Sequence, residues 1–447
     1  MSPSTLADRP NADEFAQVRD VECIFPDANG HPRGKLIKVQ DCADGKPLRI
    51  AQVVLLQTLT GDYASDARVG DTDDDMLLVP AWASWRRLPW QPSRGLLIHD
   101  CIGKDGAPVG LAPRTVLKRV ISTLADHGLR AVVAPELEFY VFQADGNNEQ
   151  GFQFPLRRDG SREILQSAYS VDTALELAPF WADVESYCSS LAIPSDSWLH
   201  EMGPSQFEIN LLHGDPLQAA DQVVLFKYAL REAAARHGLR VVFMAKPVAG
   251  QPGSSMHLHQ SVIKADGSNL FSAVDGSSSM AFRHYLGGLQ AYLPELMAFF
   301  APYVNSWRRY VRDSGAPVNV EWGIDNRTAG LRVPRAESAA RRVENRLPGS
   351  DANPYLAIAA SLAAGLAGME EALEPRPDIS AASAYHAART LPDGLHAALR
   401  VLAASRMARQ YLGAHFIEAW CAVKIKELDH CMAEVSVWDR RFLARAV

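Results

Sequence analysis

Two histidines lie in a short stretch whose spacing could place both side chains in one site. In PGSSMHLHQS, His257 and His259 are two residues apart. Side chains of a β-strand alternate between its two faces, so both imidazoles would share one face, with Met256 and Leu258 on the other. By itself this pair is as readily structural as functional, and its meaning depends on what faces it.

Carboxylates show the same alternation in other segments. In a strand, alternate residues of PELEFYVF and of QFEINLL would carry polar groups on one face and apolar groups on the other. Strands are depleted in glutamate, and glutamate is rarely buried, so such segments among apolar neighbours indicate a site and not merely an exposed face. The carboxylates of these two segments are Glu136, Glu138 and Glu208. RRVENR adds Glu344, two residues before Arg346, and Glu201 lies seven residues before Glu208, near the start of that strand.

Five carboxylates and an imidazole brought together would repel one another unless cations neutralised them. Ligands rich in oxygen suit Mg²⁺ or Mn²⁺ better than zinc, and these metals commonly bridge the phosphates of ATP. Arginine, which binds carboxylate and phosphate groups, is well represented downstream of the histidines. These arginines are Arg309, Arg327, Arg332 and Arg346. No GxxxxGK[ST] motif is present, so the phosphate site is not a P-loop.

The composition of the chain limits its expected partners and its expected location in the cell. The chain has 447 residues, 47% hydrophobic and 22% charged, with a formal net charge of −7, which argues against a nucleic-acid partner. No apolar run reaches 18 residues, so no membrane span is expected, and the N-terminus lacks the apolar core of a signal peptide. Six cysteines without a CxxC pair suit reduced thiols, and a cytoplasmic location is expected.

The order of sequence patterns predicts an α+β fold with a short leader and two domains. Residues 1–15 read as a flexible polar leader, and residues 16–110 as a small domain of short strands, beginning with a hairpin around PDANG. Residues 111–447 read as a large domain in which helices opening at Pro113 and Pro216 each end at HGLR, before a strand. From about Asn353 the chain is expected to be mostly helical.

Five segments in order resemble the motifs of the glutamine synthetase family. They are PELEF, HEMGPSQFEI, PGSSMHLHQS, DNRTAGLRVP and RVENRLPGSDANPYLAIAA, and the resemblance extends from about Val21 to the end. It implies an N-terminal β-grasp domain and a catalytic domain built on an antiparallel sheet. It also implies a homo-oligomer, usually a dodecamer of two stacked hexameric rings, with active sites between neighbouring subunits.

The resemblance also implies roles for individual residues. Glu138, Glu201 and Glu208 look like ligands of a first metal, and Glu136, His257 and Glu344 like ligands of a second. ATP contacts correspond to His259, Ser261, Arg327 and Arg332, and glutamate contacts to Gly253, Arg309 and Arg346. Arg327 also corresponds to the residue that holds the transferring phosphoryl group, which makes it the candidate catalytic residue.

The implied reaction is phosphorylation of the γ-carboxylate of L-glutamate by ATP, followed by attack of a nitrogen nucleophile on the acyl phosphate. Where ammonia-using members carry an acid in a loop over the site, this chain reads RDSGAPVNVEW, with Gly315 in the acid's place. The chain resembles the gamma-glutamylpolyamine synthetase branch more, so a primary amine is the expected acceptor. An ammonia-using glutamine synthetase and a non-catalytic scaffold with the same fold remain as alternatives.

Overall fold

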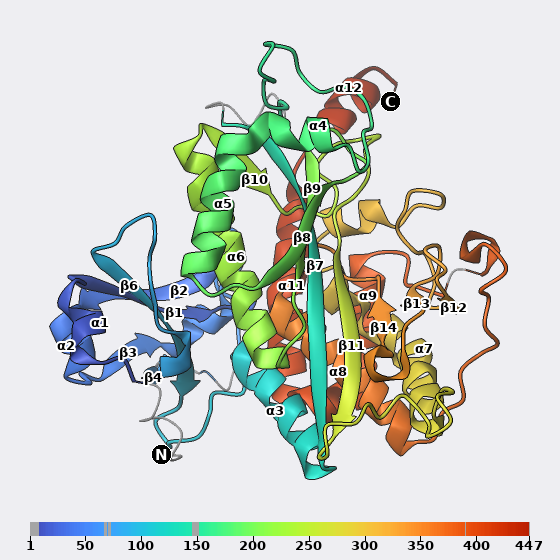
Figure 1. Ribbon diagram of the computed structural model, residues 1–447, viewed down its shortest axis with the longest axis horizontal. Helices are drawn as coiled ribbons and strands as arrows, with labels where there is room; N and C mark the ends of the chain where they lie inside the picture. Colours follow the sequence, from blue (N-terminus) through green and yellow to red (C-terminus); the bar gives the residue numbers. More distant parts are fainter. Residues whose placement is uncertain (1–8, 67–68, 70–72, 145–151, 389, 447) are drawn as a thin grey trace.

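The computed structural model describes residues 9–66, 69, 73–144, 152–388 and 390–446. A small N-terminal sheet lies to one side of a larger body whose longest strands, β7 and β11, run through its centre (Figure 1). Residues 1–8 of the predicted leader lie outside the described residues, and Ala12–Ala16 form the short helix α1. The described residues contain no helix long and apolar enough to cross a membrane.

The N-terminal sheet has the strand order β2-β1-β6-β4-β3, and β5 pairs with β6. The hairpin predicted around PDANG is confirmed: β1 pairs antiparallel with β2, and Gly30 takes a φ of +79° in the turn between them. Strand β1 also pairs with β6 in parallel, which joins the first and last long strands of this part. The elements here are β1 (Asp20–Pro26), β2 (Pro32–Lys38), α2 (Val39–Ala43), β3 (Leu48–Ala51), β4 (Asp75–Pro80), β5 (Arg86–Arg87) and β6 (Arg94–Ile102).

The larger sheet has the order β12-β13-β14-β11-β7-β9-β8, with β10 pairing β7. Its central pairs are antiparallel, which confirms the expected α+β fold class. The β12–β13 pair is parallel, a feature that the sequence did not predict. The strands are β7 (Leu129–Gln143), β8 (Ser195–His200), β9 (Gln206–Leu211), β10 (Leu239–Val242), β11 (Met256–Lys264), β12 (Trp322–Ile324), β13 (Leu331–Val333) and β14 (Val343–Asn345).

Helices cover the apolar face of this sheet and leave the other face to the polar side chains. Helix α3 begins at Pro113, as predicted, and α6 is capped by Asp215, whose side chain accepts from the N–H groups of Leu217 and Gln218. Leu137 and Phe139 are buried in the core between β7 and the helices. The helices are α3 (Pro113–Asp126), α4 (Val171–Ala174), α5 (Ala178–Ser190), α6 (Pro216–Arg236), α7 (Met280–Phe300) and α8 (Pro354–Glu370).

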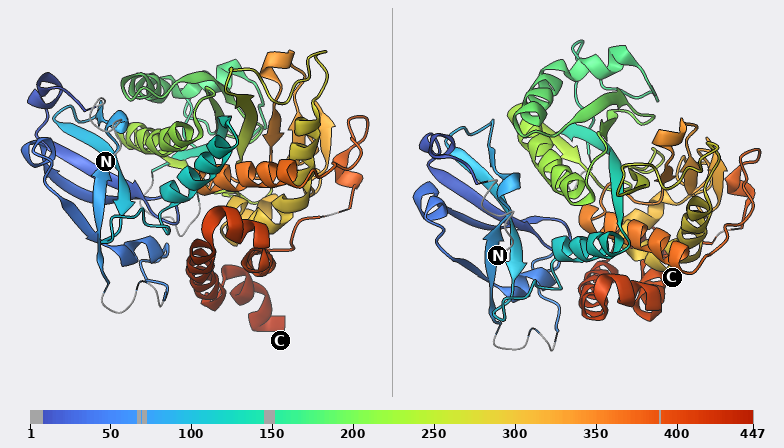
Figure 2. Two further views of the ribbon diagram at one scale, coloured as in Figure 1. Left: turned by 90° about the horizontal axis from the view of Figure 1, so that it is seen from below. Right: turned by 60° about the horizontal axis from the view of Figure 1, so that its bottom comes forward.

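The C-terminal third is mostly helical, as predicted. Asn353 caps α8, which is buried along most of its length against α7 and α3. Helix α11 then packs on α9, and the two further views show this C-terminal group lying beneath the body of the larger domain (Figure 2). These helices are α9 (Leu395–Ala404), α10 (Arg406–Ala408), α11 (Ala414–Ala433) and α12 (Val437–Ala446), and a π-helical turn spans Arg409–Gly413.

Candidate active site

Strand register brings the predicted site residues together on one face of the larger sheet. Glu136 on β7 lies directly opposite His257 on β11, and Glu138 lies opposite Glu208 on β9. His259 in turn lies opposite Glu344 on β14. Side chains directly opposite on paired strands have neighbouring Cβ atoms, so each pairing places two site groups in contact.

The first cluster contains three carboxylates, Glu138, Glu201 and Glu208, whose oxygens lie within 4.8 Å of one another. Burial and the neighbouring Glu201 raise the pKa of Glu138 to about 8, and burial with the Glu138 charge raises the pKa of Glu208 to about 9. Burial also raises the pKa of Glu201. Among the described residues, no ion pair neutralises these three side chains, so the cluster strongly favours a bound cation.

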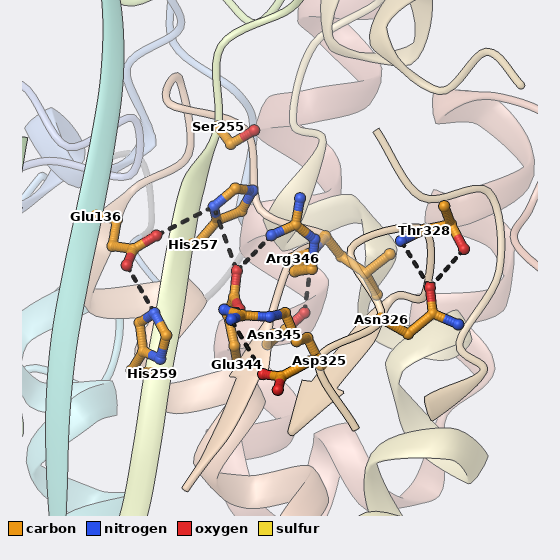
Figure 3. A network of polar contacts seen from close by, with 12 residues as sticks. Glu136, Ser255, His257, His259, Asp325, Asn326, Thr328, Glu344, Asn345 and Arg346 are labelled. Carbon is orange, nitrogen blue, oxygen red and sulfur yellow. Dashed lines mark hydrogen bonds and ion pairs between the residues drawn. The ribbon is translucent and has the colours of Figure 1, made fainter. Parts of the chain in front are cut away.

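The second cluster, formed by Glu136, His257 and Glu344, is held by hydrogen bonds and ion pairs with other side chains of the chain itself (Figure 3). His257 Nδ1 lies 3.4 Å from Glu136 Oε2 and 3.5 Å from Glu344 Oε1, and His259 Nε2 lies 2.8 Å from Glu136 Oε1. Burial alone would raise the pKa of Glu136, but hydrogen bonds with His257 and His259 outweigh it and hold the pKa far below its usual value. Burial, with the Arg346 charge, lowers the pKa of His257 to about 4, so its imidazole is neutral at pH 7, as a metal ligand must be.

Glu344 is the acceptor for two arginines. Its side chain is 1% exposed, and it forms ion pairs with Arg332 at 2.8 Å and with Arg346 at 2.5 Å. Burial opposes ionisation, but the Arg346 and His257 charges lower the pKa of Glu344 to about 2. The Nε atoms of Arg332 and Arg346 are buried without a hydrogen-bond partner within the described part of the chain. Buried donors of this kind indicate a place for an anionic ligand.

The remaining predicted residues differ in how firmly they are held. Arg309 is 2% exposed and donates to the carbonyl oxygens of Leu347 and Arg346 and to Ser255 Oγ. A Cβ at Gly253 would lie 2.7 Å from Arg309 Cγ, so the glycine is required for this packing. Arg327 is exposed in the turn between β12 and β13, where its charge acts on Glu201.

Glu201 is held in place by His200 and Glu163, two residues that were not predicted to belong to the site. The sequence placed it near the start of a strand, whereas it lies in the turn between β8 and β9. The buried ring of His200 contacts the Glu201 carbonyl oxygen at 2.7 Å through Nδ1 and Glu163 through Nε2 at 3.1 Å. Glu163 also accepts from the N–H of Ser205, a residue with a φ of +51°. Nothing in the sequence around Glu163 marks it, because it comes from a loop without periodicity.

Next to the second cluster lies a cavity of about 690 Å³. Glu136, His259 and Ser261 line it, so two predicted nucleotide contacts border the same space as a predicted metal ligand. Arg342 also lines the cavity, and its Nε donates to His259 Nδ1 at 3.2 Å. Arg342 was not among the residues predicted for the site, although it lies two residues before Glu344 and shares the same alternation.

The described side chains fit the divalent cations that the carboxylate pattern predicted. Three groups of side chains could each hold an ion, and all lie on this face of the sheet. They are Glu138 with Glu201 and Glu208, Glu136 with Glu208 and His257, and Glu136 with His259 and Glu344. Oxygen donors dominate each group, which suits Mg²⁺ or Mn²⁺.

The comparisons with known proteins agree with this geometry. A family model described as the catalytic domain of glutamine synthetase matches residues 110–443. The glutamine synthetase of Pyrococcus abyssi (strain GE5 / Orsay) is 36% identical over 356 residues, which cover 79% of this chain and 76% of that protein. The gamma-glutamylputrescine synthetase of Escherichia coli (strain K12) is 32% identical over 422 residues, covering 93% of this chain and 89% of that one.

A solved complex of GmaS with ADP has the same fold. Its TM-score with this chain is 0.84 at 31% identity, and the match covers 96% of this chain and 97% of that one. Together with the family model, these matches show that the chain belongs to the glutamine synthetase family of ATP-dependent glutamate ligases.

Proposed function

We propose that the protein joins the γ-carboxylate of L-glutamate to a primary amine, using ATP and forming γ-glutamyl phosphate. The observation that carries the choice of an amine is Gly315. By the family resemblance it stands where ammonia-using members carry an acid. Its φ is +82°, and apart from its two chain neighbours no described residue has an atom within 4 Å of the position of a Cβ. Ammonium is a small cation that needs fixed negative partners in a pocket from which water is excluded. A glycine with open space in front of it leaves room for a larger acceptor.

Each part of the site has a role in this reaction. Glu138, Glu201 and Glu208 would hold one divalent ion, and Glu136, His257 and Glu344 a second; bound there, the ions would supply positive charge to the triphosphate. The cavity lined by His259 and Ser261 has the size and polarity for the nucleotide. Arg332 and Arg327 would hold phosphate oxygens, and the Arg327 guanidinium would stabilise charge on the transferring phosphoryl group.

Glutamate would be held by Arg309 and Arg346, and Gly253 allows the backbone to pack closely against the Arg309 side chain. Its γ-carboxylate oxygen attacks the γ-phosphorus of ATP, the bond to the bridging oxygen breaks, and ADP leaves. The amine nitrogen then attacks the acyl carbon, phosphate leaves, and the nitrogen loses one proton. Holding all reactants in one orientation replaces an improbable encounter in solution by a step within the complex.

Because only the neutral amine is a nucleophile, the reaction rate should depend on pH. An alkyl amine with a pKa near ~10.4 is neutral in only about one molecule in a thousand at pH 7, and the neutral fraction rises about tenfold per pH unit. With subsaturating amine, we expect the rate to climb from pH 7 to pH 9. A flat profile under these conditions would count against a free amine as the nucleophile.

The assembly and location follow the same proposal. We propose a homo-oligomer, with a dodecamer of two hexameric rings as the expected form, in the cytoplasm. Val437, Trp438 and Phe442 on α12 are 72%, 60% and 47% exposed, and a run of exposed apolar groups suits burial against another chain. Light scattering on the purified protein measures the number of 48.9 kDa chains.

The test is glutamate-dependent release of phosphate from ATP with Mg²⁺, measured with a panel of acceptors. The panel holds ammonium, putrescine, spermidine, spermine, ethanolamine and a simple monoamine. Strong turnover with one amine and little with ammonium is the expected result, and it would identify the acceptor. Ammonium as the best acceptor would favour an ammonia-using glutamine synthetase, and no turnover with any acceptor would favour the non-catalytic alternative.

A further inference from the structure

A second cavity, of about 550 Å³, lies between the N-terminal sheet and the larger domain. Its walls come from the β1–β2 turn, from α6, from residues 302–305 and from α11, and it shares no lining residue with the cavity beside His259. Helix α6 lies on the side of the larger sheet that faces the N-terminal sheet (Figure 1), and Tyr228 on α6 donates to Glu22 on β1. The cavity is therefore a separate space at the junction of the two parts.

Two cations of α6 point into this cavity and share one aromatic ring. Lys227 and Arg231 are four residues apart, on one face of the helix. Lys227 Nζ lies 5.1 Å and Arg231 Cζ 5.5 Å from the centroid of the Phe243 ring. Lys227 also donates to the Ser350 carbonyl oxygen at 2.5 Å, whereas Arg231 forms no ion pair or hydrogen bond with the described residues. A guanidinium at a cavity wall without a carboxylate partner can bind an anion.

The acids of the cavity wall do not cancel these charges. Glu427 is already paired with Lys424 at 2.8 Å, so this pair adds no net charge. Asp351 accepts from Ser306 at 2.7 Å, and burial raises the pKa of its carboxyl. The rest of the wall is largely apolar and includes Val224, Met244, Pro302 and Leu428. Burial and the Arg231 charge lower the pKa of Lys227 to about 7, so the wall offers the full positive charge of Arg231 and a partial one from Lys227 beside an apolar surface.

The cavity wall is connected to the proposed glutamate site through two segments. Ser306, which donates to Asp351, belongs to the 3-10 turn Asn305–Arg309 that carries Arg309. Ser350, which accepts from Lys227, donates its N–H to the Ser254 carbonyl oxygen, next to Gly253. A ligand that shifts Lys227 or Asp351 would therefore act on the two segments that position Arg309 and Gly253.

We propose that this cavity binds a small organic anion, a carboxylate or phosphate ester with an apolar body, and that its binding alters the affinity for glutamate. The anionic group would lie between Lys227 and Arg231, and the apolar body against Phe243 and Met244. The binding half of the proposal stands on the cavity alone. The coupling half rests on the proposed function, because it is observed through glutamate turnover.

Cys431 provides a local readout that does not require activity. It lines the cavity and is exposed, whereas the other five cysteines are buried. The experiment measures by mass spectrometry the rate at which N-ethylmaleimide modifies Cys431 in the full-length protein, with phenyl phosphate, 3-phenylpropionate or benzylamine added. We expect saturable protection by one or both anions and none by benzylamine. The two anions distinguish a phosphate site from a carboxylate site.

Variants of Arg231 test whether protection of Cys431 depends on the guanidinium group. Arg231→Gln should weaken protection by about tenfold or more, the value of a charge-assisted hydrogen bond, and Arg231→Lys should retain part of it. Arg130→Gln, at an exposed arginine of β7 that does not line the cavity, is the matched control. Absence of protection, equal protection by benzylamine, or an unchanged protection constant in Arg231→Gln would each overturn the site.

Coupling between the cavity and the glutamate site is measured as the change in the KM for glutamate when the protecting anion is added. We expect a change of KM in the wild type that Arg231→Gln reduces. Protection with an unchanged KM would refute the coupling and leave the binding site standing. If no acceptor supports turnover, the proposed function fails, while the thiol measurement still decides whether the anion binds.

Discussion

Binding of a divalent cation to the first cluster should release protons. Glu138, Glu201 and Glu208 lie together without a cationic partner among the described residues, and burial and mutual repulsion raise the pKa values of Glu138 and Glu208 to about 8 and about 9. A carboxylate must be ionised to bind a metal ion. At pH 7 the cation-free protein therefore carries protons on this cluster that the cation must displace.

The number of protons released can be estimated from the pKa values of Glu138 and Glu208. Groups with a pKa of about 8 and about 9 are both mostly protonated at pH 7, so binding should release about two protons from the cluster as a whole. Each released proton makes the apparent affinity change about tenfold per pH unit. Affinity for Mg²⁺ should accordingly fall about a hundredfold between pH 7 and pH 6.

Isothermal titration calorimetry in buffers of different ionisation enthalpy measures this number directly. The observed heat is plotted against the buffer enthalpy, and the slope gives the protons released per ion bound. Glu208→Gln should lower the slope by about one, because it removes one titrating group. Glu374→Gln, which alters an exposed acid paired with Arg283, should leave the slope unchanged.

A slope near zero at pH 7 would refute the reasoning. It would mean that Glu138 and Glu208 are ionised before the cation binds, and hence that burial and repulsion do not hold protons on them. An affinity that is equal at pH 6 and pH 7 would lead to the same conclusion by an independent measurement.

Further predictions concern stability and specificity. The folded cluster holds protons that an unfolded chain releases near pH 4.5, so the cation-free protein should lose stability as the pH rises from about 4.5 to about 9. Mg²⁺ should oppose this loss. Urea unfolding at a series of pH values, with and without Mg²⁺, measures the two effects. Glu344→Gln leaves Arg346 without an ion pair and Arg332 with only Asp325 at 3.3 Å, and it should cost about 3–5 kcal/mol of unfolding free energy and abolish turnover. Glu374→Gln, at an exposed pair, should change the stability little. A small loss in Glu344→Gln would show that the pairs contribute little. Gly315→Glu should raise the ratio of kcat/KM for ammonium to that for the amine by about tenfold or more, relative to Gly315→Ala, which carries the same strain at positive φ without the carboxylate. An equal ratio in both variants would show that position 315 does not select the acceptor.

Local patterns predicted the elements of the site well because they depend on neighbours in the chain. Pro113 and the Asp215 cap mark helix starts that α3 and α6 confirm. Alternation correctly placed Glu136 with Glu138 and His257 with His259 on shared faces. Glu163 could not be found in this way, since it acts on Glu201 through His200 from a loop with no pattern of its own.

Pairing between distant strands could not be predicted by the same means. Glu136 faces His257 across more than a hundred residues of sequence, and a shift of one residue in that pairing would turn the histidines to the other face of the sheet. Only the ordered motifs, through the family resemblance, placed these residues in one site in advance. Arg342 shows the limit of that approach: the alternation that selected Glu344 also includes Arg342, but no motif role was assigned to it.

The pairing of charges is a further property that the sequence does not contain. In the sequence the five carboxylates cannot be distinguished from one another. Their total negative charge predicts that cations bind, but not which carboxylates bind them. In the structure, Glu344 forms ion pairs with two arginines and Glu136 forms hydrogen bonds with two imidazoles, while Glu138, Glu201 and Glu208 have no such partner among the described residues. The demand for an external cation therefore falls mainly on the β7–β9 side of the site. For this reason the proton release at Glu138 and Glu208 tests the electrostatics of the site more directly than any change at Glu344.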